Sequence, residues 1–570
     1  MQSRLSQSRN ALSTKRIPWR AAIVSFLRAG VTRRKDQRFP LWLAFPLIFV
    51  ALYLTHAPLL RLPYYWDEAG YYIPAAYDFF RTGSLIPYST LTNAHPPLPA
   101  LYLAAWWKLS GFSPQTTRFA QILVSAITLL GIYRLAERVT GRVSIAVATT
   151  LLTGLYPVWF AQSTLAHADL LAAAFTLWGL VFYLPSMDGL PRRIVPAVLC
   201  FALAALSKET AICTPAALFA CEAASLLRGA PEKVALRRMA WLLAPPLLLS
   251  GWYIYHWRRT GFIFGNPEFL RYNAASTLVP MRILLALGHR TVQLTLHMNL
   301  FVPVLCACAA LFLSPRLAAD GSSRPSLPRS VLTPLLGVLL ANLLFFSVLG
   351  GALLTRYLLP LYPLVLLLCV TAFWRRVPGW GSLVALAAVA FGLGIFINPP
   401  YRFAPEDNLA YADMIRLQQD AIHVAVHRYP RKTILTAWPA TDELTKPELG
   451  YMKWPVAIVG IDNFSLPQIQ RAAALPGYSV ALIFSTKYAP ARIPFSLGAR
   501  NEALDRRYFD DYHDLSPQAV ARLLGGEMVW HEERKGQWAA ILHFNRPPQA
   551  RAGSACGDTS VTCAGAHPAL

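Results

Sequence analysis

The feature that most constrains the fold of this chain is a series of apolar runs of nearly bilayer length. A spanning helix needs about 20 mainly apolar residues, because the bilayer core offers no water to bond exposed backbone groups. Only 14% of the 570 residues are charged, against roughly 25% in soluble proteins. We therefore predict a polytopic α-helical membrane protein. Its eleven spans lie at residues 39–60, 118–134, 143–160, 169–185, 194–206, 211–227, 240–257, 300–318, 331–349, 357–373 and 381–397.

Basic residues concentrate in alternate short loops, which is the pattern of cytoplasmic loops. These loops carry Arg134, Arg138 and Arg142; Arg192 and Arg193; Arg228, Lys233, Arg237 and Arg238; Arg316, Arg324 and Arg329; and Arg375 and Arg376. The opposite loops, and everything after about residue 400, are then predicted to lie outside. The net charge of +24 thus indicates membrane topology and contact with anionic lipid rather than nucleic-acid binding.

The chain divides into four predicted parts. Residues 1–38 form a basic cytosolic leader, and residues 39–400 form the transmembrane domain, with long outer loops at 61–117 and 258–299. Residues 401–547 form a soluble α/β domain, because β-like runs at 432–437, 455–461, 479–484 and 538–544 alternate with helical stretches such as 516–525. Residues 548–570 form a flexible tail rich in Ala, Gly and Pro.

Two of the eight cysteines, Cys556 and Cys563, lie in that tail and could pair as a local disulfide outside the cytosol. The other six lie in apolar runs and are predicted to pack as small hydrophobic residues. No zinc-binding spacing is present.

The outer loop 258–299 carries arginines although it lies outside in this topology: Arg258, Arg259, Arg271, Arg282 and Arg290. Long loops tolerate charge, so these residues need no special role. The alternative is a cationic rim that binds a phosphate at the membrane surface. The sequence leaves both open.

Two adjacent carboxylates, Asp67 and Glu68, follow the first span within "YYWDEAGYY" (64–72). They could be a solvated pair in an interfacial aromatic belt. However, further polar residues are predicted on the same outer face, and together they favour a functional site. These are His95 in "HPPL", Asp169 in "AHADLLAAAF", Lys208 and Glu209 in "LAALSKETA", and Arg356 and Tyr357 in "TRYLLPLYP".

These five motifs, in this order, resemble the membrane glycosyltransferases with the GT-C fold. The resemblance covers residues 39–400 and is greatest to the branch that includes protein O-mannosyltransferases and the aminoarabinose transferase acting on lipid A. It implies a sugar donor carried on a polyprenyl phosphate, an active site at the outer membrane surface, and horizontal helices in the outer loops. The Asp-Glu pair is the hallmark of that family.

On this resemblance, the acceptor hydroxyl needs a base and the departing phosphate needs cations. Asp67 is the expected base, and Glu68 or Asp169 would orient the acceptor or keep Asp67 ionised. Further residues are expected to bind the substrates: Arg356 and Lys208 pair with the phosphate, His95 donates to phosphate or sugar, Tyr71 stacks on a sugar, and Glu209 and Tyr357 complete the site. Direct displacement would invert the anomeric centre.

One segment departs from the resemblance. Aminoarabinose transferases carry Glu-Lys-Pro where this chain has Ala94-His95-Pro96. This difference argues against carrying over an aminoarabinose donor, a lipid A acceptor or a metal site. We expect no required cofactor, although Asp67, Asp169 and His95 could in principle bind a divalent metal.

Other functions stay open at this stage. A transporter or lipid flippase would place charged residues near span centres and show inverted repeats. A scaffold protein would need an exposed motif in the C-terminal domain, where "TAWPATDELTKPELGY" (436–451) is the strongest candidate. A polymerase or ligase of lipid-linked glycans would use the same ingredients. The charge bias suggests a bacterial plasma membrane, with the site and the C-terminal domain in the periplasm and the acceptor a glycolipid, protein or glycan.

Overall fold

The computed structural model describes residues 40–187, 189–229, 231–267, 271, 277–318, 320–349, 351–488, 499–509 and 512–545. The predicted leader, and the predicted tail with Cys556 and Cys563, lie outside these ranges. The elements described below belong to one compact unit, Leu41–Leu570.

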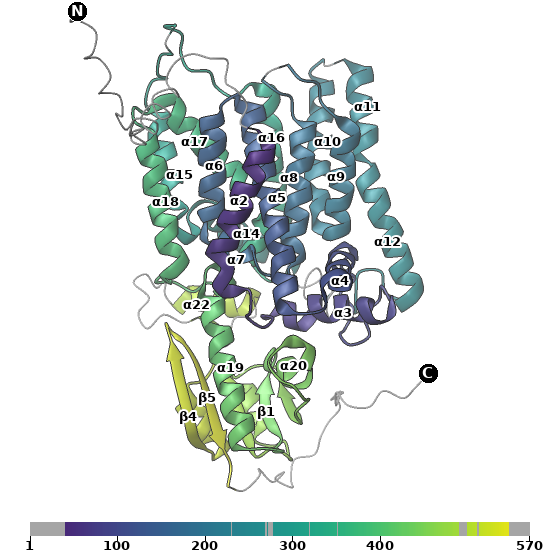
Figure 1. Ribbon diagram of the computed structural model, residues 1–570, viewed down its shortest axis with the longest axis vertical. Coiled ribbons are helices and arrows are strands. Elements are labelled where there is room, and N and C mark those ends of the chain that lie inside the picture. The colour runs from purple at the N-terminus through teal and green to yellow at the C-terminus, as the bar shows by residue number, and fades with distance from the viewer. Residues whose placement is uncertain are drawn as a thin grey trace, which may run out of the picture. The chain divides into compact units, whose positions relative to one another are not determined.

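A helix lies at each of the predicted apolar runs, and the helices run side by side as a bundle (Figure 1). They are α2 (Leu41–His56), α5 (Pro114–Thr140), α6 (Val143–Leu155), α8 (Ala168–Tyr183), α9 (Ile194–Ser207), α10 (Cys213–Leu227), α12 (Ala244–Thr260), α15 (Phe301–Leu311), α16 (Arg329–Val348), α17 (Tyr362–Arg376) and α18 (Gly381–Phe396). Two short helices, α7 (Pro157–Gln162) and α11 (Glu232–Leu242), extend this set.

Helix α5 is the most enclosed of the long apolar helices and packs against α2, α6 and α8. Its start is set by Ser113, whose hydroxyl accepts the Thr116 N–H at 3.1 Å, and by Pro114 at the first helical position. Its end is set by Gly141, which adopts the left-handed conformation that glycine tolerates without steric cost.

Among the described residues, four helices are long and apolar enough to cross a membrane: Leu41–Leu59, Pro114–Thr140, Glu209–Leu227 and Arg329–Val348. A fifth candidate is the pair Pro280–Asn299 and Phe301–Leu311, which bends by 102°. Four further apolar helices are shorter. The chain thus has several candidate spans, and the count of eleven stays a prediction.

The basic loops lie together in the structure, as the charge pattern predicts. The guanidinium carbons of Arg324 and Arg142 lie 4.9 and 5.2 Å from the centre of the Trp374 ring, and the Met187 N–H donates to the Arg138 carbonyl at 3.0 Å. These basic loops therefore share one end of the bundle. Which side of the membrane this end faces stays a prediction.

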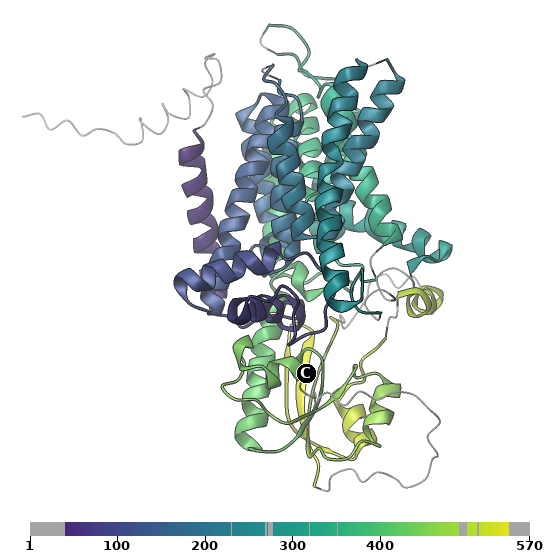
Figure 2. The same ribbon diagram turned by 90° about the vertical axis from the view of Figure 1, so that its right-hand side faces the viewer.

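The two long loops predicted to lie outside contain helices of their own. The first holds the π-helical turn η2 (Glu68–Tyr72), α3 (Ile73–Thr82) and α4 (Leu98–Ser110). Helices α3 and α4 cross the end of the bundle that faces the C-terminal region (Figures 1 and 2). The second loop holds α14 (Pro280–Thr295), which the 102° bend turns away from the direction of α15.

The C-terminal region contains the predicted small sheet. Strands β1 (Ile434–Ala437), β2 (Ile458–Ile461), β3 (Val480–Phe484), β4 (Glu527–Arg534) and β5 (Gln537–His543) are ordered β2-β1-β3-β5-β4. Strand β1 pairs in parallel with β2 and β3, whereas β5 is antiparallel to β3 and β4. Its helices are α19 (Ala410–Arg428), α20 (Ala440–Thr445), α21 (Leu466–Ala472), α22 (Ala499–Phe509) and α23 (Pro517–Leu524).

Strand β4 was missed by the sequence analysis because it lies at the sheet edge and half of its residues, in "EMVWHEER", are charged. The sheet region contacts the first outer loop directly. The Tyr64 N–H donates to the Leu449 carbonyl at 3.3 Å, and the Tyr451 hydroxyl donates to the Tyr64 carbonyl at 3.0 Å. The predicted domain boundary at residue 400 falls between α18 and the turn η7 (Pro405–Asp407).

The packing of α8 on α9 gives a first prediction. A Cβ at Gly179 would come within 2.4 Å of the Phe201 ring, so Gly179→Ala is expected to destabilise the protein by about 1–3 kcal/mol through overpacking. Gly251→Ala on α12 is the matched control, since nothing lies within 4 Å of its Cβ position. Thermal unfolding in detergent should show a lower midpoint for Gly179→Ala only, and equal midpoints would contradict this packing.

Candidate functional site

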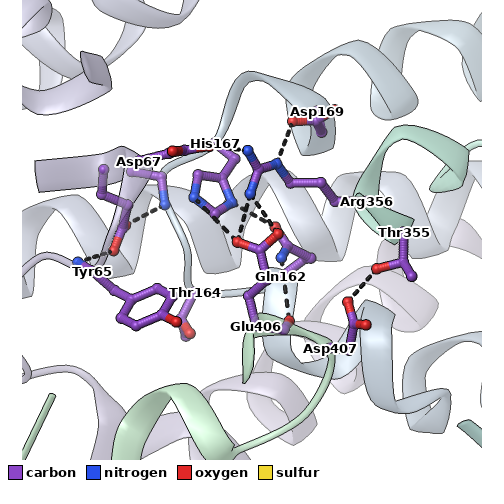
Figure 3. Close-up of polar contacts among 12 residues, drawn as sticks. Tyr65, Asp67, Gln162, Thr164, His167, Asp169, Thr355, Arg356, Glu406 and Asp407 are labelled. Atoms are coloured by element: carbon purple, nitrogen blue, oxygen red, sulfur yellow. Dashed lines mark hydrogen bonds and ion pairs between the residues drawn. The ribbon is translucent and has the colours of Figure 1, made fainter. Parts of the chain in front are cut away.

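Arg356 lies at the centre of a buried cluster of charged side chains (Figure 3). It belongs to the turn η6 (Thr355–Leu358), between α16 and α17. Its guanidinium contacts the carboxyl groups of Asp67 and Glu406, and its Nε lies 3.3 Å from Oδ2 of Asp169. Burial lowers the pKa of Arg356, but these three carboxyl groups outweigh burial and raise it well above the usual value. Arg356 therefore stays cationic.

The two predicted acids reach Arg356 from different elements. Asp67 follows Trp66, whose φ of 46° is rare for a bulky residue, and directly precedes η2. Asp169 lies in the first turn of α8, where the helix dipole favours negative charge. The Asp67 side chain is 19% exposed, whereas that of Asp169 is 3% exposed. Asp67 is therefore the acid that a substrate can reach.

Lys208 stands behind Arg356 as a second cation. It lies at the break between α9 and the 3-10 turn Glu209–Ile212, and its Nζ is 2.5 Å from Oδ1 of Asp169. The same Nζ is 3.9 Å from the centre of the Tyr357 ring, a cation–π contact. Lys208, Asp169, Arg356 and Tyr357 border a small space of about 20 Å³.

A cavity of about 620 Å³ opens beside this cluster. Five of the predicted residues line it: Asp67, Tyr71, His95, Arg356 and Tyr357. The other four do not: Glu68, Asp169, Lys208 and Glu209. The site thus has an inner layer that faces the cavity and an outer layer that supports it.

His95 and Glu209 form a pair at the edge of the cavity. His95 Nδ1 lies 3.0 Å from Oε2 of Glu209, and the His95 ring stacks on that of Tyr72 with centroids 5.9 Å apart. Burial would raise the pKa of Glu209, but His95 and Lys208 outweigh it and hold that pKa at about 2. Glu209 is therefore ionised and positions His95.

Glu406 is a third partner of Arg356 that the sequence analysis missed. It lines the cavity from η7, the turn between α18 and α19, where no motif distinguishes it from an ordinary loop acid. Burial, assisted by Asp67, Asp407 and Asp169, raises the pKa of Glu406 to about 8 although Arg356 opposes this.

His167 stands next to Glu406, with its Nε2 4.0 Å from Oε2 of that residue. Its Nδ1 lies 2.8 Å from the Gln162 side-chain oxygen. Burial and the nearby cations Arg356 and Lys208 lower the pKa of His167 well below its usual value, so the ring is neutral. A neutral ring whose Nδ1 donates to Gln162 leaves Nε2 as an acceptor directed at Glu406.

Glu68 is buried away from the cavity and is paired with Arg118 of α5. Its carboxylate also accepts the Ala166 N–H at 2.5 Å and the Tyr65 N–H at 2.9 Å. Arg118 in turn donates to the carbonyls of Thr164 and Pro63, each at 2.8 Å. The pair ties the segment before Asp67 to α5 and to the loop before α8, so its geometry indicates a positioning role.

Two of the arginines from loop 258–299, Arg282 and Arg290, are buried on α14. Together with Gln293 they donate to four successive backbone carbonyls, those of residues 351–354, at distances between 2.6 and 3.3 Å. These two arginines therefore hold the segment that leads into Arg356 instead of forming an exposed rim. Arg258, Arg259 and Arg271 are exposed.

In the part of the chain that the structure describes, no group of three or more His, Cys, Asp or Glu side chains is arranged to hold a metal ion. Asp67, Asp169 and His95 are thus not grouped as metal ligands there. Asp67 is paired with Arg356, Asp169 with Lys208, and His95 with Glu209.

Comparison with known proteins tests the predicted fold and the resemblance to the membrane glycosyltransferases. Residues 94–251 match the family described as dolichyl-phosphate-mannose-protein mannosyltransferase. The crystal structure of ArnT from Cupriavidus metallidurans bound to undecaprenyl phosphate is 13% identical, with a TM-score of 0.50 over 87% of this chain and 97% of that chain. The apo structure of the same protein is 15% identical, with a TM-score of 0.49 and the same coverage.

A cryo-electron microscopy structure of the arabinofuranosyltransferase AftD from Mycobacteria is 17% identical, with a TM-score of 0.40 over 78% of this chain and 36% of that chain. No curated protein matches significantly. The chain shares its fold with the ArnT structure that contains undecaprenyl phosphate, and its apolar helices make it a multi-pass membrane protein. Its resemblance to the mannosyltransferase and ArnT branch of the GT-C glycosyltransferases is confirmed.

The Glu68–Arg118 pair gives the second prediction. Glu68→Gln leaves the buried Arg118 charge without a counter-ion and is expected to destabilise the protein by about 3–5 kcal/mol. Asp420→Asn is the control, because Asp420 is half-exposed in its pair with Arg534 and should contribute at most about 1 kcal/mol. The destabilisation of both variants is measured from their thermal unfolding midpoints. Equal, small shifts would refute the structural role of Glu68.

Proposed function

We propose that this protein is an integral-membrane glycosyltransferase that moves a sugar from a polyprenyl-phosphate donor to an acceptor hydroxyl. The reaction takes place at the outer face of the plasma membrane. The observation that carries the proposal is Arg356, a buried cation that borders the cavity together with the more exposed carboxylate of Asp67. The ArnT-like fold and the matched family segment support the same reaction class.

Arg356 and Lys208 supply the cations that a lipid phosphate requires. Arg356 reaches the cavity directly, whereas Lys208 acts from behind through Asp169 and the Tyr357 ring. An arriving phosphate competes with the carboxyl groups for the Arg356 guanidinium. Because Asp67 is the most exposed of these groups, it is the one expected to be released.

The released Asp67 then acts as general base. It accepts the proton of the acceptor hydroxyl while that oxygen attacks the anomeric carbon. The bond from that carbon to the phosphate oxygen breaks, and the electron pair leaves with the polyprenyl phosphate, whose charge Arg356 stabilises. This direct displacement inverts the anomeric centre. A base within hydrogen-bond reach contributes about 10²–10⁴-fold to the rate.

The remaining predicted residues have supporting roles. His95, whose Nδ1 faces Glu209, lines the cavity, and in the imidazolium form, with both ring nitrogens protonated, its Nε2 donates a hydrogen bond to the phosphate or the sugar. Tyr71 offers a ring face to a sugar at the cavity wall. Glu68, through Arg118, positions the segment that carries Asp67. No metal is required by this scheme.

The transporter alternative is less well supported by the cluster. Its charged groups come from the turn before η2, from the first turn of α8, from the end of α9 and from the turns η6 and η7, so they lie at helix ends. A transport site is typically formed near the bilayer midplane by broken helices. An acceptor glycolipid, protein or glycan and a bacterial plasma membrane remain part of the proposal.

Replacing the base gives the third prediction. Asp67→Asn keeps the size of the side chain and removes the base, so transfer of radiolabelled sugar from polyprenyl-phosphate donors should fall about 10²–10⁴-fold. Binding of undecaprenyl phosphate should be retained. Transfer and binding are both measured in membranes that contain equal amounts of each protein, and Asp413→Asn on α19 is the control. Undiminished transfer by Asp67→Asn would refute this mechanism.

The raised pKa of Glu406 gives the fourth prediction. The carboxyl group loses its proton as the pH rises through about 8, and the new negative charge beside Arg356 opposes a phosphate. The affinity of the wild type for undecaprenyl phosphate should therefore fall between pH 7 and pH 9. Glu406→Gln cannot ionise, and its affinity should stay nearly constant. The same decline in both proteins would show that another group titrates.

A further inference from the structure

An aromatic side chain from the C-terminal region reaches the wall of the cavity. Trp438 follows β1 directly and precedes α20, and it lines the cavity together with Trp66 and Tyr71 of the first outer loop. The Trp438 ring packs edge-to-face on Trp66, with centroids 5.1 Å apart, and lies 6.0 Å from the Tyr71 ring. We call Trp66, Tyr71 and Trp438 the aromatic wall.

The position of Trp438 is set on several sides. Its Nε1 donates to Oδ2 of Asp442 at 3.2 Å. Gly70 lies directly beneath the indole, and a Cβ at that position would come within 2.7 Å of it. Only glycine allows this close approach without moving the indole, so the C-terminal region is fitted to the turn that follows Asp67.

The backbone next to Asp67 supports the same conclusion. Trp66 has a φ of 46°, a conformation that is unfavourable for a bulky residue and persists only where the surroundings hold it. Trp66 is held by the rings of Tyr65 and Trp438. The strained residue thus carries both the ring that contacts Trp438 and the peptide that leads into Asp67.

We propose that the aromatic wall is a saccharide-binding subsite for the acceptor, with Trp438 as its platform. Flat aromatic faces bind the apolar C–H faces of sugar rings, and they leave the hydroxyl groups at the ring edge available to a base. The wall adjoins Asp67, the group that must meet the acceptor hydroxyl. The donor phosphate is expected on the other side of Asp67, at Arg356.

This inference rests on the proposed glycosyl transfer and goes further, because it assigns an acceptor-recognition role to the C-terminal region. It also assigns a substrate class. The acceptor group that is recognised is itself a sugar ring, as in a glycolipid or a glycan, and not an amino-acid hydroxyl alone. A protein acceptor without sugars would leave the aromatic wall unused.

The test compares Trp438→Ala, Trp438→Phe and Gly70→Ala with wild type in proteoliposomes. A cell-envelope glycan extract serves as acceptor at serial dilutions, with the labelled donor that the wild type uses. Trp438→Ala and Gly70→Ala should raise the apparent KM for the extract about fivefold or more, as expected for a lost aromatic contact. Trp438→Phe should show a smaller rise. Binding of undecaprenyl phosphate should stay within about twofold of wild type.

Trp454→Ala is the matched control, since this tryptophan of the same region is 78% exposed. It should leave both measurements unchanged. Wild-type KM values for Trp438→Ala and Gly70→Ala would overturn the subsite. Parallel losses of phosphate binding and transfer would also overturn it, because they would show that Trp438 only supports the fold.

A second measurement separates the subsite from the proposed function. Saturation-transfer NMR with maltotriose detects saccharide contact without any turnover. If the wild type transfers no sugar and binds no undecaprenyl phosphate, the proposed function fails. Saturation transfer that is present in wild type and lost in Trp438→Ala would still support a saccharide subsite, and equal signals in both proteins would overturn it.

Discussion

The structure depends on one cation, Arg356, which is buried where an unpaired charge would be energetically unfavourable. Arg356 is almost fully buried, and in a low-dielectric environment its charge must be balanced by close partners. Asp67 and Asp169 balance the charge, and the carboxyl group of Glu406, whose pKa is raised to about 8, adds a further polar contact. The three residues come from segments that are far apart in the sequence. The same contacts that make the burial of Arg356 tolerable bring together the elements from which the site is built.

Two further sets of polar contacts hold the segments that precede Arg356 and Asp67. The segment before Arg356 is held by α14, whose Arg282, Arg290 and Gln293 satisfy the carbonyls of residues 351–354. The segment before Asp67 is held by Glu68 and Arg118. In both cases buried side chains bind backbone groups of the segment, so Arg356 and Asp67 are each positioned by a network of polar contacts.

Much of the fold could be predicted, because apolar length and basic loops are local signals. Each predicted apolar run contains a helix, and four of the five strands coincide with predicted β-like runs. Motif position also identified Asp67, Asp169, Lys208 and Arg356, which the structure brings into one cluster. Glu406 could not be found this way, since its importance comes from long-range packing against Arg356. Trp438 lies in the segment 436–451 that the sequence suggested as a scaffold motif, but its packing on Gly70 and its place at the cavity could not be predicted. For Glu68, the sequence indicated a pair with Asp67 but could not show that its side chain points toward Arg118.

Glu406 and Trp438, whose places at the cavity the sequence analysis did not predict, both come from beyond residue 400. Glu406 lies in the turn that leaves α18, and Trp438 follows the first strand of the sheet. The C-terminal region therefore contributes Trp438 to the wall of the cavity and Glu406 to its charged cluster. If the acceptor binds at the aromatic wall as proposed, separating the two regions would remove acceptor recognition while leaving the phosphate cations Arg356 and Lys208 in place.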